Sequence, residues 1–351
     1  MERALSVAVV GAGYWGPNLA RNFRSSPDWD LVAVCDLDEA RARRVVGPRS
    51  TVDVMTSLTD VLARDDVDAI AIATPARTHA PIALAAIEAG KHVLVEKPVA
   101  DTSATGRQMV ARAEQAGLVL MVDHTFCYTP AVVKIRELIA DGSLGDIHFV
   151  DSVRINLGLV QPDVNVFWDL APHDLSILDF VLPGGLVPTG VAAQGADPLR
   201  TGQACVGYLT LPLADGAIAH VHVNWLSPTK IRQVVIGGSK RTLVWDDLSP
   251  QQRLTVHDRG VTLAGARGTD REATQVSYRL GDAWSPALPE KEALASMVAE
   301  FAASIREGRA PRTDGAAGLR VLDVLEASTV SLAHEGRLVR VTAGAGLEPV
   351  A

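Results

Sequence analysis

Short apolar runs alternate with longer amphipathic segments along the first third of the chain. β-Branched and other apolar residues predict buried strands at 5–10, 31–36, 68–74, 92–95 and 118–123. Apolar spacing and flanking Gly and Pro residues predict helices at 17–24, 38–46, 57–63, 80–89 and 101–116. This strict alternation of strands and helices is typical of a parallel, doubly wound sheet.

The pattern changes after residue 123. Helices are expected at 130–140, 168–182, 290–307 and 315–334, and a Gly- and charge-rich exposed loop at 259–272. The other segments favour strands, at 147–156, 187–194, 204–211, 218–225, 232–237, 241–245 and 274–279. Apolar and polar residues alternate from Ala219 to Trp225, as in a half-buried antiparallel strand.

Together these patterns predict an α/β protein of two domains. Residues 1–123 are expected to form the doubly wound parallel sheet, and residues 124–351 an α+β domain with a large, open, mostly antiparallel sheet. An open sheet with one uncovered face often packs on its own copy. We therefore expect a homodimer or homotetramer through the C-terminal sheet.

Composition and charge narrow the function classes. Of 351 residues, 48% are hydrophobic and 21% are charged, which argues for a full core and against disorder. The net charge of −8, without a block of Lys and Arg, argues against nucleic-acid and membrane partners. The chain shows no signal peptide or membrane-length apolar run, and its three cysteines are scattered. We expect a cytoplasmic protein without disulfides or a metal site.

A glycine-rich turn, GAGYWG at residues 11–16, follows the first strand and opens the first helix. Gly11 permits the tight turn, Gly13 lets the backbone approach a pyrophosphate, and Gly16 allows close helix–strand packing. The free N–H groups of the helix N-terminus favour phosphate. We therefore expect a Rossmann domain that binds a dinucleotide here. The two aromatic residues of the turn are also expected to contact it, Tyr14 and Trp15.

An acidic residue, Asp36, ends the second strand 20 residues after Gly16. An acid at this position hydrogen-bonds the adenosine ribose and repels a 2′-phosphate, which favours NAD over NADP. Arg41 and Arg43 follow closely, so use of NADP stays open. The loop after the strand at 68–74 reaches the same edge of the sheet. Three of its residues are expected to border the cofactor, Thr74, Pro75 and His79, and His79 either contacts the nicotinamide half or caps the next helix.

Glu96 and Lys97 follow the strand at 92–95, and Pro98 prevents the strand from continuing. Open α/β sheets bind ligands at the carboxyl ends of their strands. By itself, a Glu-Lys pair before a turn is ordinary surface sequence. Its place behind a dinucleotide fingerprint makes Lys97 a candidate for the chemical step and Glu96 a candidate contact to the cofactor.

Asp169 and His173 lie four residues apart at the start of a predicted helix, so they share one face. An anion there can orient an imidazole, which suits reversible proton transfer. An Asp near a helix N-terminus also interacts favourably with the helix dipole, without any catalytic role. Alcohol oxidation needs a group that takes the hydroxyl proton and a positive group that stabilises the alkoxide. Lys97, Asp169 and His173 form a sufficient set.

The turn at 11–16, Glu96-Lys97-Pro98 and the Asp169/His173 pair, in this order and at these intervals, resemble the Gfo/Idh/MocA family. These are NAD(P)-dependent sugar and cyclitol dehydrogenases. The resemblance extends from about residue 5 to 340. It implies a Rossmann domain followed by an α/β domain with a large open sheet, and it implies that Lys97, Asp169 and His173 form the catalytic group.

Three stretches, at 13–23, 123–126 and 154–178, look like the branch of UDP-N-acetylglucosamine and UDP-N-acetylglucosaminuronate 3-dehydrogenases. That branch implies oxidation at C3 of a nucleotide-linked sugar. One departure is the sequence His-Thr-Phe at 124–126, where many relatives carry Asn-x-Arg-Phe. Beyond Lys97 and His173, the candidate contacts to the sugar or diphosphate are Tyr128, Arg154, Asn156, Gln161 and Asn165.

Other functions stay open. The chain could reduce a dTDP-linked keto sugar with NADPH in deoxysugar biosynthesis, or it could oxidise inositol or a free sugar. A non-catalytic dinucleotide-binding regulator is a different class, and such a protein should have lost Lys97 or the Asp169/His173 pair.

Overall fold

A computed structural model of the chain describes residues 3–161, 164–264 and 275–341. Contacts divide the chain into unit 1, residues 1–129 and 290–326, and unit 2, residues 130–289 and 327–351. The sequence analysis placed residues 290–326 in the second domain, whereas their contacts place them in unit 1. Trp29 shows why: its indole N–H donates to the Val298 carbonyl over 2.7 Å, and its ring stacks on Phe301.

Unit 1 contains a six-stranded sheet in the order β3-β2-β1-β4-β5-β6, with every neighbouring pair parallel. The strands are β1 (Leu5–Val10), β2 (Trp29–Cys35), β3 (Asp53–Met55), β4 (Ala69–Ile72), β5 (His92–Glu96) and β6 (Leu120–Asp123). The predicted doubly wound Rossmann sheet is confirmed. The three-residue β3 was missed because so short a segment carries no periodicity.

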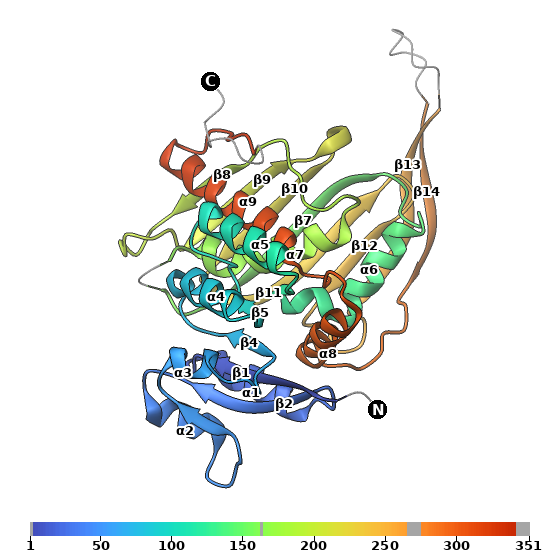
Figure 1. Cartoon of the computed structure of the whole chain (residues 1–351). Helices are drawn as coiled ribbons and strands as arrows, with labels where there is room; N and C mark the ends of the chain where they lie inside the picture. Colours follow the sequence, from blue (N-terminus) through green and yellow to red (C-terminus); the bar gives the residue numbers. More distant parts are fainter. Residues whose placement is uncertain (1–2, 162–163, 265–274, 342–351) are drawn as a thin grey trace. The chain divides into compact units, whose positions relative to one another are not determined.

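Crossover helices keep the strands parallel, so the carboxyl ends of all six lie at one edge of this sheet. Figure 1 shows these strands and helices at the N-terminal, blue end of the chain. The helices of unit 1 are α1 (Gly16–Ser25), α2 (Glu39–Val46), α3 (Leu58–Leu62), α4 (His79–Glu88), α5 (Ser103–Ala116), α8 (Ala293–Glu307) and the first part of α9 (Gly315–Ala333), with the short 3₁₀ turns η1 (Ala76–Thr78) and η2 (Thr125–Tyr128). Local sequence sets their ends. The Asp38 side chain accepts hydrogen bonds from two amides of α2, and Gly117 ends α5 with a φ of 65°.

Unit 2 contains an eight-stranded sheet in the order β14-β13-β12-β11-β7-β10-β9-β8. Among the described strands of this sheet only β7 and β10 pair in parallel, so the predicted open, mostly antiparallel sheet is confirmed. The strands are β7 (Ile147–Leu157), β8 (Ala192–Ala196), β9 (Val206–Pro212), β10 (Ile218–Asn224), β11 (Leu226–Gly238), β12 (Thr242–Asp246), β13 (Leu254–Ala264) and β14 (Gln275–Trp284).

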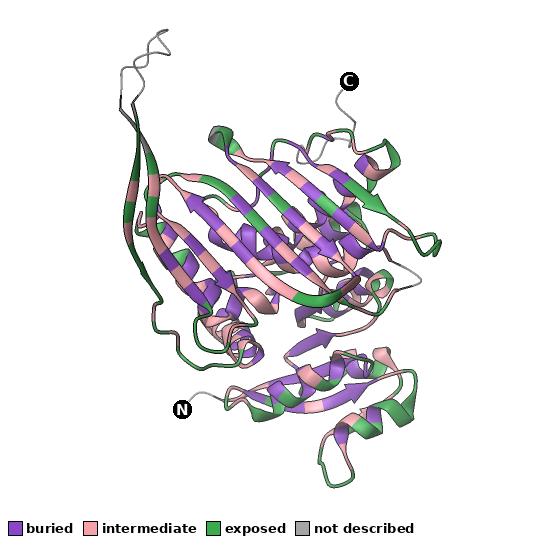
Figure 2. Ribbon diagram, turned by 180° about the vertical axis from the view of Figure 1, so that it is seen from behind, coloured by how far each residue is buried: buried purple, intermediate pink, exposed green. Residues whose placement is uncertain are grey.

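Helices cover one face of this sheet. They are α6 (Pro130–Ala140), α7 (Val166–Val181) and the end of α9, and a 3₁₀ turn η3 (Ala214–Gly216) joins β9 to β10. Figure 2 shows the opposite face, on which no helix of the described part of unit 2 lies. Alternation along the strands matches this asymmetry: in β10, Ala219, Val221 and Val223 are buried, and the residues between them are more exposed.

Two predictions for this region were wrong. The expected strand at 187–194 begins only at residue 192, and Val187 is exposed. The expected loop at 259–272 is strand β13 up to Ala264, and its later part lies outside the described residues. Gly260 and the neighbouring charges hide the strand pattern in the sequence. Pairing with β14, in which Val261 lies opposite Tyr278, satisfies the backbone nonetheless.

A buried ion pair holds α7 on the sheet. Arg154 of β7 donates to both carboxylate oxygens of Asp174 on α7, over 2.7 and 3.1 Å. The Ser152 hydroxyl donates to the same carboxylate over 2.8 Å. The side chains of Arg154 and Asp174 are only 3% and 2% exposed. The bidentate geometry and the added hydroxyl compensate the desolvation of two charges.

Arg154→Met should therefore lower the free energy of unfolding by about 3–5 kcal/mol, because it leaves the Asp174 carboxylate buried without its counter-charge. Urea denaturation followed by circular dichroism measures this. Replacing both partners, as Arg154→Met with Asp174→Leu, should recover most of the loss, since no charge is then buried alone. Arg43→Met, which breaks an exposed pair with Glu39, is the matched control and should cost less than about 1 kcal/mol. A cost for Arg154→Met as small as that of the control would contradict this account.

Candidate active site

The glycine turn has the geometry that a diphosphate requires. Gly11 has a φ of 102°, and a Cβ there would lie 2.5 Å from the Ala73 carbonyl oxygen. A Cβ on Gly16 would lie 2.0 Å from the Gly11 carbonyl oxygen. Both positions therefore require glycine. Gly13 is exposed, and nothing lies within 4 Å of where its Cβ would be, so its backbone is open to close approach by a phosphate.

Asp36 is held at the end of β2 by two backbone amides. Ala12 N–H donates to one carboxylate oxygen over 2.7 Å, and Asp38 N–H donates to the other over 2.8 Å. Each oxygen has a further lone pair that can accept a ribose hydroxyl. The two nearby arginines have acidic partners on α2 and its cap. Arg41 lies 3.2 Å from the Asp38 carboxylate, and Arg43 pairs with Glu39.

His79 joins two loops at the same edge of the sheet. It is 1% exposed, with Nδ1 2.8 Å from the Pro98 carbonyl oxygen and Nε2 2.8 Å from the Thr74 carbonyl oxygen. Burial lowers its pKa, and the two carbonyls act in the opposite direction. The ring does not cap α4, contrary to one of the two predicted roles. It links the loop after β4 to the turn that carries Lys97, whose peptide bond to Pro98 is cis.

Two carboxyl groups flank Lys97 at the ends of β5 and β6. Glu96 and Asp123 are direct neighbours in the strand register. Burial and the Asp123 charge raise the pKa of Glu96, while the Lys97 ammonium lowers it. Burial also raises the pKa of Asp123, against hydrogen bonds from the Thr125 hydroxyl and the Trp15 indole. The Trp15 bond measures 2.6 Å. Tyr14, by contrast, points into solvent, with 92% of its surface exposed.

The predicted acid–base pair of unit 2 lies in the first turns of α7. Asn165 caps this helix, accepting from the amides of Phe167 and Trp168 over 3.0 and 3.2 Å. The Trp225 indole N–H donates to the Asp169 carboxylate over 2.9 Å. His173 follows one turn later, next to the buried Asp174. Helix position and side-chain contacts thus fix Asp169 and the backbone that carries His173.

Trp225 was missed by the sequence analysis as a site residue. It is 1% exposed and directly follows β10. Its backbone carbonyl accepts from the Gly158 amide, and its backbone amide donates to the Cys205 carbonyl. The alternating pattern at 219–225 predicts a strand that ends in a large aromatic residue. It gives no sign that this indole reaches a carboxylate 56 positions earlier.

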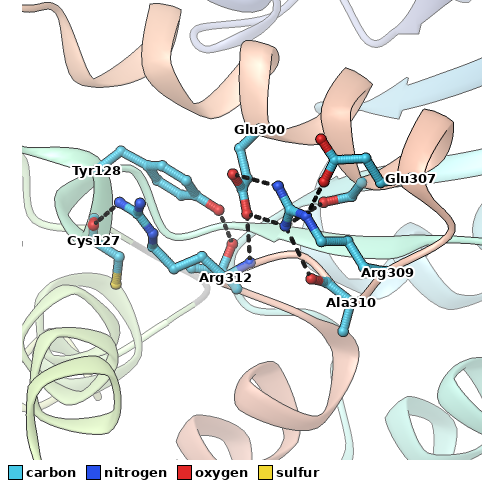
Figure 3. A network of polar contacts seen from close by, with 9 residues as sticks. Cys127, Tyr128, Glu300, Glu307, Arg309, Ala310 and Arg312 are labelled. Carbon is cyan, nitrogen blue, oxygen red and sulfur yellow. Dashed lines mark hydrogen bonds and ion pairs between the residues drawn. The ribbon is translucent and has the colours of Figure 1, made fainter.

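The structure gives Tyr128 partners inside unit 1. Its side chain is 3% exposed, and its hydroxyl lies 3.0 Å from the Thr313 hydroxyl. Figure 3 shows Tyr128 with Arg312 and Cys127 beside it. The Arg312 guanidinium lies over its ring, 4.8 Å from the centroid, and donates to the Cys127 carbonyl. Burial raises its pKa far above the ordinary value. This placement favours a structural role for Tyr128 over the predicted contact with substrate.

The other predicted substrate residues divide into two groups. Arg154 is occupied by Asp174, and the Asn165 carbonyl oxygen is occupied by the helix cap. Asn156 and Gln161 are half-buried, at the end of β7 and in the loop after it. These two are better placed to meet a ligand.

Among the described residues, no group of three or more His, Cys, Asp or Glu side chains could hold a metal ion. In the same part of the chain, no helix is both long enough and apolar enough to cross a membrane.

Known proteins resemble this chain in both sequence and fold. A family model described as an oxidoreductase family with an NAD-binding Rossmann fold matches residues 5–124. A second model, the Gfo/Idh/MocA C-terminal domain, matches residues 132–244. The UDP-N-acetylglucosamine 3-dehydrogenase of Acidithiobacillus ferrooxidans is 27% identical over 91% of this chain and 94% of its own. The D-apiose dehydrogenase of Paraburkholderia graminis is 27% identical over 95% of this chain and 89% of its own.

Solved structures agree. GenD2 from gentamicin A biosynthesis, crystallised in complex with NAD, is 28% identical, with a TM-score of 0.80 over 97% of both chains. Among the sequence relatives, the inositol 2-dehydrogenase of Rubrobacter xylanophilus is 38% identical over 143 residues, which cover 40% of this chain and 41% of its own. The two family models, the fold and these relatives lead to one conclusion: the chain belongs to the Gfo/Idh/MocA family and is an NAD-binding oxidoreductase.

Proposed function

We propose that this enzyme oxidises a hydroxyl group of a nucleotide-linked sugar to a ketone with NAD, at C3 of a UDP-N-acetyl sugar. The observation that supports this choice of substrate is the similarity to a UDP-N-acetylglucosamine 3-dehydrogenase along nearly the whole of both chains. Asp169 and His173, held at the start of α7, and Lys97, at the end of β5, supply the side chains that this reaction needs.

In this proposal each side chain has a defined role. His173 takes the proton of the sugar hydroxyl, and Asp169 orients the imidazole and balances its positive charge. Lys97 donates a hydrogen bond to the same oxygen and stabilises the developing alkoxide. Bound NAD supplies the hydride acceptor, so the sugar carbon loses one hydride and its hydroxyl one proton. Asn156 and Gln161 are the proposed contacts to the sugar or diphosphate.

NAD is the proposed coenzyme. Asp36 is fixed by the Ala12 and Asp38 amides where a 2′-phosphate would meet its charge. Arg41 and Arg43, which could otherwise bind such a phosphate, already pair with Asp38 and Glu39. The turn residues Gly11, Gly13 and Gly16 would hold the diphosphate. Thr74, Pro75 and Glu96 lie at the ends of β4 and β5, where the rest of the coenzyme would bind.

A cyclitol or free sugar is the second candidate substrate. The inositol 2-dehydrogenase of Rubrobacter xylanophilus supports it, with the higher identity but over less than half of each chain. The reverse reaction, reduction of a keto sugar, uses the same side chains with the proton moving from His173 to the oxygen.

A homodimer or homotetramer through the sheet of unit 2 is proposed as the assembly. Figure 2 shows the face of this sheet on which no helix of the described part of unit 2 lies. The strand register places six apolar residues on this face, with polar residues such as Asp151, His222 and Gln233 among them: Phe149, Val153, Ile155, Tyr208, Val235 and Val244. A second copy of this face is the proposed cover, because a two-fold axis would bring the same residues of two chains together.

The substrate is tested by nicotinamide absorbance at 340 nm with UDP-N-acetylglucosamine, its uronate, myo-inositol and free hexoses, each with NAD and NADP. We expect reduction of NAD with the UDP sugars.

Lys97→Ala should lower kcat by about 10²–10³-fold, because the alkoxide loses its positive donor, while NADH still binds. Lys134→Ala, on the exposed face of α6, is the control and should keep full activity. Unchanged turnover in Lys97→Ala would remove Lys97 from the mechanism, and turnover of inositol alone would replace the proposed substrate.

Coenzyme choice is tested by Asp36→Asn, which keeps an oxygen that can accept from Ala12 N–H but removes the charge. The ratio of kcat/KM for NAD to that for NADP should fall about tenfold, the size expected for loss of one exposed like-charge contact. Arg43→Met serves as the control, because it removes a positive charge nearby and should not improve the use of NADP. If the ratio is the same in Asp36→Asn and in the wild type, this carboxylate does not select the coenzyme.

The assembly is tested by Val153→Lys, in the middle of β7 on the open face of the sheet. A buried ammonium in the contact should convert the oligomer to monomers, as measured by size-exclusion chromatography with light scattering. Val187→Lys places the same charge on an exposed residue outside the strands and should leave the mass unchanged. An oligomer that persists in Val153→Lys, or a monomeric wild type, would refute this interface.

A further inference from the structure

Trp15 makes a contact that the glycine fingerprint does not predict. It precedes α1 as its N-cap residue, yet its side chain makes no capping hydrogen bond. Instead the indole N–H donates to one carboxylate oxygen of Asp123 over 2.6 Å. The Thr125 hydroxyl donates to the other oxygen. Asp123 is 2% exposed, so this acceptor is a fixed, buried group, and the indole is anchored at its far end.

The strand order shows what the indole crosses. A Cβ on Gly11 would lie 2.5 Å from the carbonyl oxygen of Ala73, which directly follows β4, and a Cβ on Gly16 would lie 3.9 Å from the Ala73 Cβ. The turn that carries Trp15 therefore lies beside the end of β4. Asp123 ends β6, and β5 lies between β4 and β6. Neighbouring strands are about 4.8 Å apart, so the indole, its hydrogen bond and the Asp123 side chain together span roughly 10 Å. It therefore passes the end of β5, where Glu96 and Lys97 lie.

The indole lies on the side of the glycine turn that would face the nicotinamide half of the coenzyme, and not on the side that would face the adenosine half. Asp36, the proposed ribose acceptor of the adenosine half, ends β2, on the opposite side of β1 from β4 and β5. The diphosphate would bind at the turn between these two sides. Any group that extends from the diphosphate toward Lys97 meets the indole, whereas a group that extends toward Asp36 does not.

We propose that Trp15 is a positioning residue whose indole, anchored on Asp123, forms a wall of the nicotinamide subsite beside Lys97. This inference rests on the proposed NAD site. It does not depend on which sugar is oxidised. A flat, rigid ring anchored at both ends limits where the nicotinamide can lie, which matters because hydride transfer requires close alignment of the reacting carbons.

The alternative is that the Trp15–Asp123 bond only braces the glycine turn. The two roles differ in their effect on two ligands. ADP-ribose contains the adenosine and diphosphate but lacks the nicotinamide ring, and NADH contains all three. A brace of the turn supports the binding of both ligands, whereas a wall of the nicotinamide subsite supports only NADH.

The test is isothermal titration of NADH and of ADP-ribose into the full-length protein and into Trp15→Phe, which removes the indole N–H and keeps an aromatic ring. The Kd of NADH should rise about tenfold, and that of ADP-ribose should stay within about twofold. Asp123→Leu removes the anchor from the other end and should give the same selective loss. Thr125→Val is the matched control: it removes the other donor to Asp123, leaves the indole bond, and should keep both Kd values.

Equal weakening of both ligands in Trp15→Phe, or no change for either, would overturn the inference, with thermal unfolding of each variant showing that it is folded. These outcomes are separate from those of the substrate assay. Selective loss of NADH binding supports the wall even if no UDP sugar is oxidised. A folded wild type that binds ADP-ribose but not NADH would overturn both the nicotinamide subsite and the proposed coenzyme.

Discussion

Six parallel strands that end at one edge of a sheet impose the constraint on which the coenzyme half of this enzyme depends. At that edge the ladder stops, so the last backbone groups need other partners. Side chains supply them: Asp36 accepts from the Ala12 and Asp38 amides, and His79 spans the Thr74 and Pro98 carbonyls. The same hydrogen bonds that complete the fold therefore hold the loops from which a coenzyme site is built.

Unit 2 meets a different requirement. It must hold α7, a helix that carries polar side chains, in a fixed position on its sheet. Arg154 and Asp174 do so with a buried, bidentate pair, and the Trp225 indole adds a second tie at Asp169. These two contacts lie on either side of His173 along α7. A helix held only by apolar packing could slide or rotate at lower cost, because dispersion contacts are not directional. Buried polar contacts fix its register instead.

The sequence predicted most of the fold and part of the site, and the exceptions have physical causes. Local signals located Gly11, Asp36 and the helices, because turns, caps and strand periodicity depend on neighbouring residues. Arg154 was interpreted as a substrate contact because its partner is 20 positions away, and only folding brings them together. The sequence likewise gave no sign of the partner of Tyr128, since Thr313 lies 185 positions later. The return of residues 290–326 to unit 1 is likewise a long-range effect.

The two carboxyl groups beside Lys97, those of Glu96 and Asp123, lower the free energy of unfolding when the pH rises. Burial raises the pKa values of Glu96 and Asp123 in the folded chain, with the Asp123 charge adding to the effect on Glu96. For an acid whose pKa is raised by folding, the unfolded chain loses its proton first as the pH rises. The stability present below the unfolded pKa then declines, by up to about 1.4 kcal/mol per pH unit for each group, until the folded pKa is passed. At neutral pH the protein therefore keeps two acids where burial disfavours their charge. Apolar residues at the ends of β5 and β6 would avoid this cost, but they would leave the Trp15 indole without its acceptor and Lys97 without neighbouring carboxyl groups.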